Sequence, residues 1–147
     1  MNNYSKRTFT AFIIITAACT LPAKSQSLFD CSASSGKGYY LESSLLPEEK
    51  ASWKDDGVSE GGIALVRQGD TIDILIKDIV GVGSVKADGA EVVLVDAYEG
   101  FVTVLVNYLG GSKELYTFDS SRKMVFWSQH KFGVMFDKSA TYIANCR

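Results

Sequence analysis

The sequence is poor in the residue types on which most catalytic and metal-binding motifs depend. Its 147 residues include a single histidine, His130, and only three cysteines. A zinc site takes three or four Cys, His or carboxylate ligands at characteristic spacings, and a histidine base needs a nucleophile and an orienting carboxylate beside it. Ser128 and Asp137 are the nearest candidates, but their spacing fits no serine-hydrolase pattern. We therefore expect no catalytic residue, no metal and no cofactor.

Phosphate-binding and calcium-binding loops are also missing. The glycines at positions 81, 83, 110 and 111 lack the order Gly-x-x-x-x-Gly-Lys-Ser/Thr, so we interpret them as turns or bulges. The acidic segment 55–60 lacks the alternating acids and the final Glu of a calcium loop, and it is expected to be a solvated turn. Lys and Arg are not clustered, which argues against binding of nucleic acid or of anionic lipid.

No apolar run is long enough for a typical membrane span, yet the N-terminus has the order of a secretory signal. Lys6 and Arg7 precede an uncharged stretch of about 16 residues, whereas a spanning helix needs about 20. We predict a signal peptide over residues 1–27, cut before Gln26 or Leu28. The mature protein is then periplasmic or secreted, with no membrane span after processing.

Two other interpretations of the N-terminus stay open. Small residues from Thr16 onward precede Cys19, as in a lipobox, so a lipoprotein anchored through Cys19 is an alternative. An uncleaved N-terminal anchor is the other. Removing residues 1–27 takes away three basic side chains and leaves 12 basic against 17 acidic ones, a net charge of −5.

Two cysteines remain after such a cleavage, Cys31 and Cys146, one near each end of the mature chain. A pair of cysteines in an exported protein usually forms a disulfide. A chain of about 120 residues can bury a core of its own, so the bond would reinforce one domain. We predict a single disulfide-linked β domain over residues 28–147.

Alternation of apolar and polar residues predicts an all-β fold. In the segment 71–77 the residues Ile72, Ile74 and Ile76 share one face, and 101–108 alternates in the same way, which is hard to fit on a helix. Turn residues interrupt the chain about every ten positions, the spacing of an antiparallel meander. The expected strands cover residues 62–67, 71–78, 82–87, 91–97, 101–109, 113–118, 122–129 and 140–146, with less regular ones at 132–136 and 38–41.

An up-and-down β-barrel of about eight strands is the expected architecture, because closing a sheet removes its exposed edges. A two-sheet sandwich is the alternative, since alternation alone does not separate the two. Pro47 followed by Glu48 and Glu49 predicts one short helix that ends before Asp55.

Aromatic residues are the most informative positive feature of the chain. Val125 and Trp127 fall on one face of their predicted strand and Phe126 on the other. If Trp127 enters the core, Phe126 faces solvent and can form a contact patch with Phe132. Together with His130 at the strand end, these aromatic residues are the candidate binding residues.

Part of the sequence resembles known exported proteins. The chain is similar to small exported proteins of rhizobia and related alphaproteobacteria in three places: Leu115-Tyr116-Thr117-Phe118, the segment 124–129 and the closing Cys146. Those proteins also pair an early cysteine with a terminal one. The resemblance implies a Gram-negative periplasm and assigns no activity to any residue. The run 32–36 resembles a loop of periplasmic lysozyme inhibitors, in which that loop lies late in the chain rather than early.

The leading functional hypothesis is a non-enzymatic binding or interaction module for a small ligand or an envelope protein. An envelope-polymer hydrolase is one alternative. It needs two carboxyl groups about 5 to 9 Å apart, for which Asp73, Asp78, Asp96 and Glu99 are candidates, with His130 as a possible helper. An inhibitor-like or structural envelope protein is the other.

Overall fold

A computed structural model describes residues 25–42, 50–133 and 137–147. These residues form eleven β-strands and, within the described ranges, no α-helix. The strands are β1 (Ser25–Cys31), β2 (Ser34–Tyr40), β3 (Ser52–Val58), β4 (Gly62–Gln68), β5 (Thr71–Lys77), β6 (Val82–Ser84), β7 (Ala90–Tyr98), β8 (Phe101–Tyr108), β9 (Ser112–Asp119), β10 (Met124–Lys131) and β11 (Lys138–Asn145). None of the described residues belongs to a helix that is long and apolar enough to cross a membrane.

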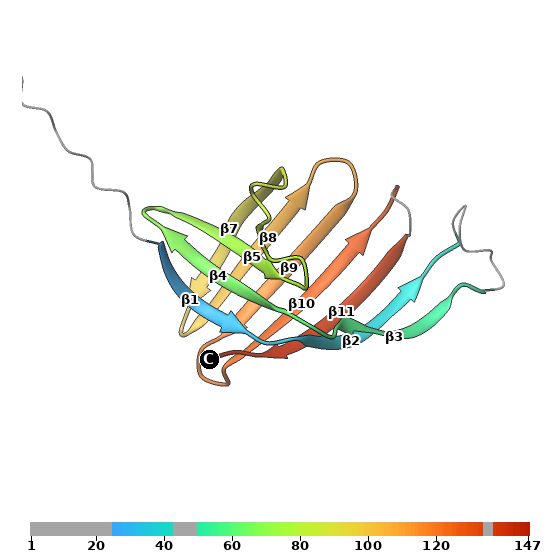
Figure 1. Cartoon of the computed structure of the whole chain (residues 1–147), viewed down its shortest axis with the longest axis horizontal. Helices are drawn as coiled ribbons and strands as arrows, with labels where there is room; N and C mark the ends of the chain where they lie inside the picture. The colour runs from blue at the N-terminus through green and yellow to red at the C-terminus, as the bar shows by residue number, and fades with distance from the viewer. Residues whose placement is uncertain (1–24, 43–49, 134–136) are drawn as a thin grey trace, which may run out of the picture.

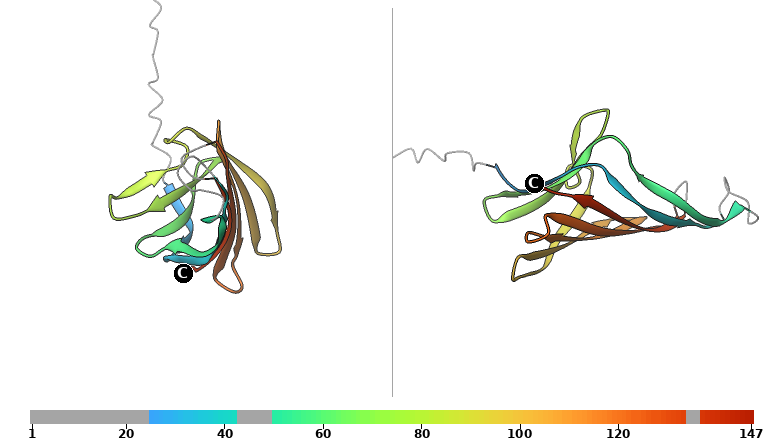
Figure 2. Two further views of the ribbon diagram at one scale, coloured as in Figure 1. Left: turned by 90° about the vertical axis from the view of Figure 1, so that its right-hand side faces the viewer. Right: turned by 90° about the horizontal axis from the view of Figure 1, so that it is seen from below.

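The strands make two antiparallel sheets. One has the order β1-β4-β5-β6 and the other the order β3-β2-β11-β10-β9-β8-β7. The smaller sheet lies across one half of the larger one, and β2 and β3 run on beyond it (Figures 1 and 2). Neither sheet closes on itself, so the predicted β-barrel is wrong, and the sandwich that we kept as the alternative fits the structure.

The barrel fails because the first strands bend from one sheet into the other. Residues 25–40 pair with residues 52–68 as one long antiparallel ribbon, but β1 and β4 belong to the smaller sheet while β2 and β3 belong to the larger one. The ribbon bends where glycine is required. A Cβ on Gly61, whose φ is 124°, would lie 1.9 Å from the Lys77 carbonyl oxygen, and one on Gly62 would lie 2.1 Å from that of Cys31.

The predicted disulfide between Cys31 and Cys146 is confirmed, and it lies at this bend. The two cysteines also face each other as an antiparallel bridge. Backbone hydrogen bonds flank it on both sides, from Ser32 N to the Asn145 oxygen at 2.8 Å and from Arg147 N to the Asp30 oxygen at 2.9 Å. The end of the last strand is therefore tied to the point where the ribbon changes sheets.

The core lies between the facing surfaces of the two sheets. Alternate residues of the central strands are fully buried, among them Val104, Tyr116, Phe118 and Val125 of the larger sheet. Leu65 and Ile74 of the smaller sheet pack against them. The alternation predicted in 71–77 and 101–108 is confirmed, since Ile74 and Val104 are among the residues with no exposed surface.

The short helix predicted before Asp55 is not present in the described part of the segment. Residues 47–49 lie outside the described residues, whereas Ser52–Val58 form β3, in register with β2. Cross-strand contacts explain the strand: Tyr39 packs edge-on against Trp53, and Lys37 forms an ion pair with Asp55 at 2.8 Å. The strand expected at 132–136 also falls largely outside the described residues.

Candidate functional site

The four binding residues expected from the sequence do not share one surface. Trp127 lies on the inner face of β10 with 7% of its surface exposed, whereas Phe126 and His130 lie on the outer face and are exposed. His130 Nδ1 is 3.1 Å from Ser139 Oγ. Phe132 follows the strand and is also exposed. Only Trp127 therefore faces the space between the sheets.

The carboxylates proposed for a hydrolase are bonded to their own local turns and strands. Asp73 accepts hydrogen bonds from Ile74 N and Ser84 Oγ, and Asp78 accepts them from the amides of residues 80 and 81. Asp96 accepts one from the next amide, and Glu99 accepts one from Tyr98. In the described ranges, no group of three His, Cys, Asp or Glu side chains is arranged to hold a metal ion.

A polar pocket occupies the end of the inner face that the smaller sheet does not cover. It has a volume of about 230 Å³, and we call it the Asp56 pocket. Strand alternation places its side chains, because every second residue of β10 and β11 points inward. Its lining includes Asp56, Trp127, Gln129, Lys131, Lys138 and Tyr142.

Asp56 reaches this pocket from the edge strand β3 by crossing β2. Its Oδ2 accepts hydrogen bonds from Lys138 Nζ at 2.8 Å, Tyr142 OH at 2.7 Å and Tyr40 OH at 3.0 Å. The intervening strand, β2, has glycine residues where the Asp56 side chain passes over it. A Cβ on Gly36 would lie 2.8 Å from the Tyr142 ring, and one on Gly38 would lie 3.2 Å from Asp56 Oδ2.

These contacts set the protonation of the cluster. Burial would raise the pKa of Asp56, but the hydrogen bonds from Lys138, Tyr142 and Tyr40 outweigh it and hold that pKa below its ordinary value. Burial, with the bond to Asp56, raises the pKa of Tyr40 to about 12 and raises the pKa of Tyr142 further. At neutral pH the site therefore contains a carboxylate with protonated phenols and an ammonium donating to it.

A second buried carboxylate lies one strand along, in an adjoining pocket of about 340 Å³ that we call the Glu114 pocket. Glu114 is 7% exposed. It accepts hydrogen bonds from Tyr116 OH at 2.5 Å, Gln129 Nε2 at 2.5 Å and Ser112 Oγ at 3.2 Å. Burial, followed by the neighbouring Glu114 charge, raises the pKa of Tyr116 well above its ordinary value. Lys131 lines both pockets.

Two donors in this region have no acceptor among the described residues. Trp127 stacks between Tyr116 and Tyr142, with ring centroids 5.1 and 4.1 Å away, and its buried Nε1 has no hydrogen-bond partner there. The Lys131 ammonium forms no ion pair within the described part of the chain, whereas Lys138 is paired with Asp56. Buried polar groups are nearly always hydrogen-bonded, so the indole N–H marks a place where an acceptor is expected.

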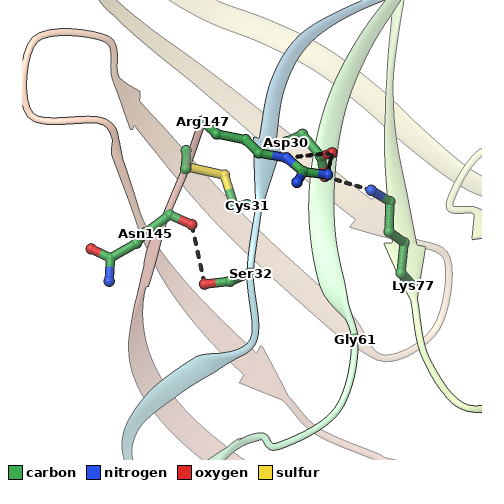
Figure 3. Close-up of a pocket in the computed structure, with 8 residues that line it drawn as sticks. Asp30, Cys31, Ser32, Gly61, Lys77, Asn145 and Arg147 are labelled. Carbon is green, nitrogen blue, oxygen red and sulfur yellow. Dashed lines mark hydrogen bonds and ion pairs between the residues drawn. A yellow bond between two sulfur atoms is a disulfide. The ribbon is translucent and has the colours of Figure 1, made fainter.

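A third pocket lies beside the disulfide and has a different character (Figure 3). Its volume is about 440 Å³. Its charged side chains already pair with one another: Asp30 binds Lys77 and, at 2.9 Å, Arg147, and these hydrogen bonds lower the pKa of Asp30. We interpret this pocket as part of the junction that joins the chain end to the ribbon.

Sequence reasoning missed Asp56, Glu114 and Gln129, although a signal for two of them was present. Glu114 has the same alternation as the buried Tyr116, and Gln129 has the same alternation as the buried Trp127. A polar residue at the inward position of a strand is unusual and indicates a buried network. Asp56 had no such signal, because β3 was not predicted.

Comparison with known proteins adds no relative: no family model, curated protein or solved structure matches this chain. The site is therefore interpreted from its own geometry.

Proposed function

We propose that this protein is an exported, non-enzymatic binding protein whose Asp56 pocket binds a small polar ligand. The observation that carries the proposal is the indole N–H of Trp127, which is buried beside a pocket lined by Lys131 and Lys138 and has no acceptor among the described residues. A pocket with an aromatic wall and a few placed polar groups is the usual form of a small-molecule site.

The same geometry favours binding over hydrolysis. Glycoside hydrolysis by two carboxyl groups needs one of them to be protonated at working pH, but the pKa of Asp56 is lowered. Both oxygens of Asp56 already accept hydrogen bonds, Oδ1 from Gly57 N at 2.8 Å. Both oxygens of Glu114 are likewise engaged. These hydrogen bonds hold both carboxylates in place, which favours an orienting role over a catalytic one.

Export supports this role. A disulfide persists in oxidising compartments, and the Cys31–Cys146 bond is of that kind. The signal-like residues 1–27 and the resemblance to exported proteins of alphaproteobacteria point to the periplasm, with a lipoprotein anchored at Cys19 as the alternative. Mass spectrometry of the protein from its native envelope tests this: a mass that includes the intact residues 1–27 contradicts cleavage.

Tryptophan fluorescence tests the binding function directly. The chain has two tryptophans, and Trp53 is on the outer face with 68% of its surface exposed. A Trp53→Phe variant therefore leaves Trp127 as the only tryptophan, which is excited selectively at wavelengths where tyrosine does not absorb. Neutral sugars, amino acids, polyamines and small oxyanions are titrated against it, and we expect a saturable change in emission with one class. If no class changes the emission or raises the melting temperature, the binding function is wrong.

A second candidate function uses the outer face of the larger sheet. Val93, Leu105 and Leu115 are cross-strand neighbours there, and Phe126 pairs with Ile143 on the adjacent strands. Leu115 and Phe126 expose 41% and 43% of their surfaces. Such a patch suits contact with an envelope protein. A photo-crosslinker at Phe126, compared with one at Lys86, tests it: equal labelling at both positions contradicts a specific contact.

A further inference from the structure

In the Asp56 pocket the carboxylate already accepts from donors of the protein, whereas two donors beside it have no partner among the described residues. Asp56 accepts four hydrogen bonds within the protein, from Tyr40, Gly57, Lys138 and Tyr142. Three of these bonds go to Oδ2, so the oxygen of Asp56 nearest the pocket donors is already engaged. Within the described residues, the Trp127 indole N–H and the Lys131 ammonium are donors without a partner, and the Gln129 side-chain oxygen is the neutral acceptor beside them.

Charge within the pocket points the same way. Lys138 is neutralised by Asp56 at 2.8 Å, whereas Lys131 has no acidic partner at ion-pair distance in the described ranges. The buried acid Glu114 lines the adjoining pocket and not this one. Gln129 lies between the two pockets: its Nε2 donates a hydrogen bond to Glu114, and its side chain lines the Asp56 pocket. The pocket therefore presents one unmatched positive charge.

From these two observations we infer that the ligand is a small oxyanion, a carboxylate or phosphate group that accepts from Trp127 Nε1 and pairs with Lys131. This inference rests on the binding function proposed above and adds the chemical class of the ligand. A charged acceptor between an N–H donor and an ammonium forms the stronger, charge-assisted kind of hydrogen bond. The pocket volume of about 230 Å³ limits the ligand to a small molecule or to one end of a larger one.

The test compares oxyanions with uncharged molecules of similar size. The Trp53→Phe protein is titrated with succinate and inorganic phosphate, and in parallel with succinamide and glycerol. We expect a saturable change in Trp127 emission with at least one of the oxyanions and none with the neutral molecules. Succinate without phosphate identifies a carboxylate ligand, and phosphate without succinate identifies a phosphate ligand.

Variants of the two donors locate the binding. Lys131→Gln in the same background should weaken oxyanion binding about tenfold, the usual loss for one charge-assisted bond. Lys86→Gln removes a lysine exposed on the surface and should leave the affinity unchanged. Trp127→Phe keeps the aromatic stack but removes the N–H. Because it also removes the emitter, its binding is followed by the ligand-induced rise in melting temperature, which should shrink.

The outcomes separate the two proposals. If the neutral molecules or another class bind and neither oxyanion does, the binding function stands and the oxyanion inference is overturned. Equal weakening by Lys131→Gln and Lys86→Gln also overturns it, because the attraction is then general. If nothing in the full panel binds, both proposals fail.

Discussion

Asp56 and Tyr142 are 86 residues apart in the sequence, and their side chains are joined by a 2.7 Å hydrogen bond that crosses the strand between them. Tyr142 lies on β11 and Asp56 on the edge strand β3, and Gly36 of β2 is in register with both. The missing side chain at Gly36 is what lets the two groups meet. An edge strand thereby contributes a charged group to a pocket whose other main residues come from β10 and β11.

Gly36→Ala should destabilise the protein by about 1 to 3 kcal/mol, the cost of overpacking a well-filled site. The new Cβ would lie 2.1 Å from the Thr141 carbonyl oxygen, which is backbone and cannot turn aside. Urea unfolding measures the change. Gly83→Ala is the matched control, because the nearest atom to its Cβ is a side-chain oxygen at 3.7 Å. Equal stability of the Gly36→Ala variant and wild type would contradict this account of the crossing.

Asp56→Asn should lower the free energy of unfolding by about 1 to 3 kcal/mol, because it leaves the Lys138 ammonium in a shielded position without its counter-charge. The side chains of this pair are only 14% and 15% exposed. Asp55→Asn breaks the adjacent ion pair with Lys37, which is open to solvent, and should change the free energy of unfolding far less. Similar losses in the two variants would show that the Asp56 cluster contributes no special stability.

Alkaline pH should weaken the fold through the phenols that donate to Asp56. The folded pKa of Tyr40 is raised from 10.0 to about 12, chiefly by burial and then by its bond to Asp56. The stabilisation that the protonated Tyr40 phenol gives to the folded state is therefore complete below pH 10.0, and it is lost as the pH rises to about 12. Unfolding free energies measured across this range should fall less steeply in Tyr40→Phe than in wild type. Tyr39→Phe, on the outer face of the same strand, serves as the control, and an unchanged slope in Tyr40→Phe would contradict the prediction.

Loss of the disulfide should cost about 2 to 5 kcal/mol, since the bond closes a loop that spans almost the whole domain. The two cysteines are 115 residues apart in the sequence. The double variant Cys31→Ser, Cys146→Ser is compared with wild type by urea unfolding, with wild type under reducing conditions as a second measurement. An unchanged midpoint in both would show that the hydrogen bonds around Ser32 and Arg147 hold the junction without the bond.

Sequence patterns predicted the central strands well, because there the alternation of side chains follows directly from burial on one face. Val125 and Trp127 were predicted to share one face of their strand, and both are buried. The edge strands carry no such pattern. In β3 the exposed Trp53 and the ion-paired Asp55 lie on the same face, so the segment lacks an apolar side and resembles a loop in sequence.

Whether the strands form a barrel or a sandwich is decided by a few residues at the bend of the ribbon and not by the pattern within the strands. Gly61 and Gly62 allow the backbones of neighbouring strands to approach closely, and this was visible only in three dimensions. The Asp56 pocket could not be predicted from the sequence for the same reason. Asp56 and Lys138 are 82 residues apart in the sequence, and nothing in the spacing of either residue indicates the other.

The continuous ribbon that supplies strands to both sheets links the binding pocket to the core. The same chain segment delivers Asp56 to the pocket and, seven residues later, Ile63 to the packed interior. Gly61 and Gly62 fit closely against the carbonyl groups of Lys77 and Cys31, so inserting or deleting one residue between Val58 and Ile63 would disturb this bend. The length of this short connection is therefore expected to tolerate less variation among homologues than the turns at the far ends of β7 and β8.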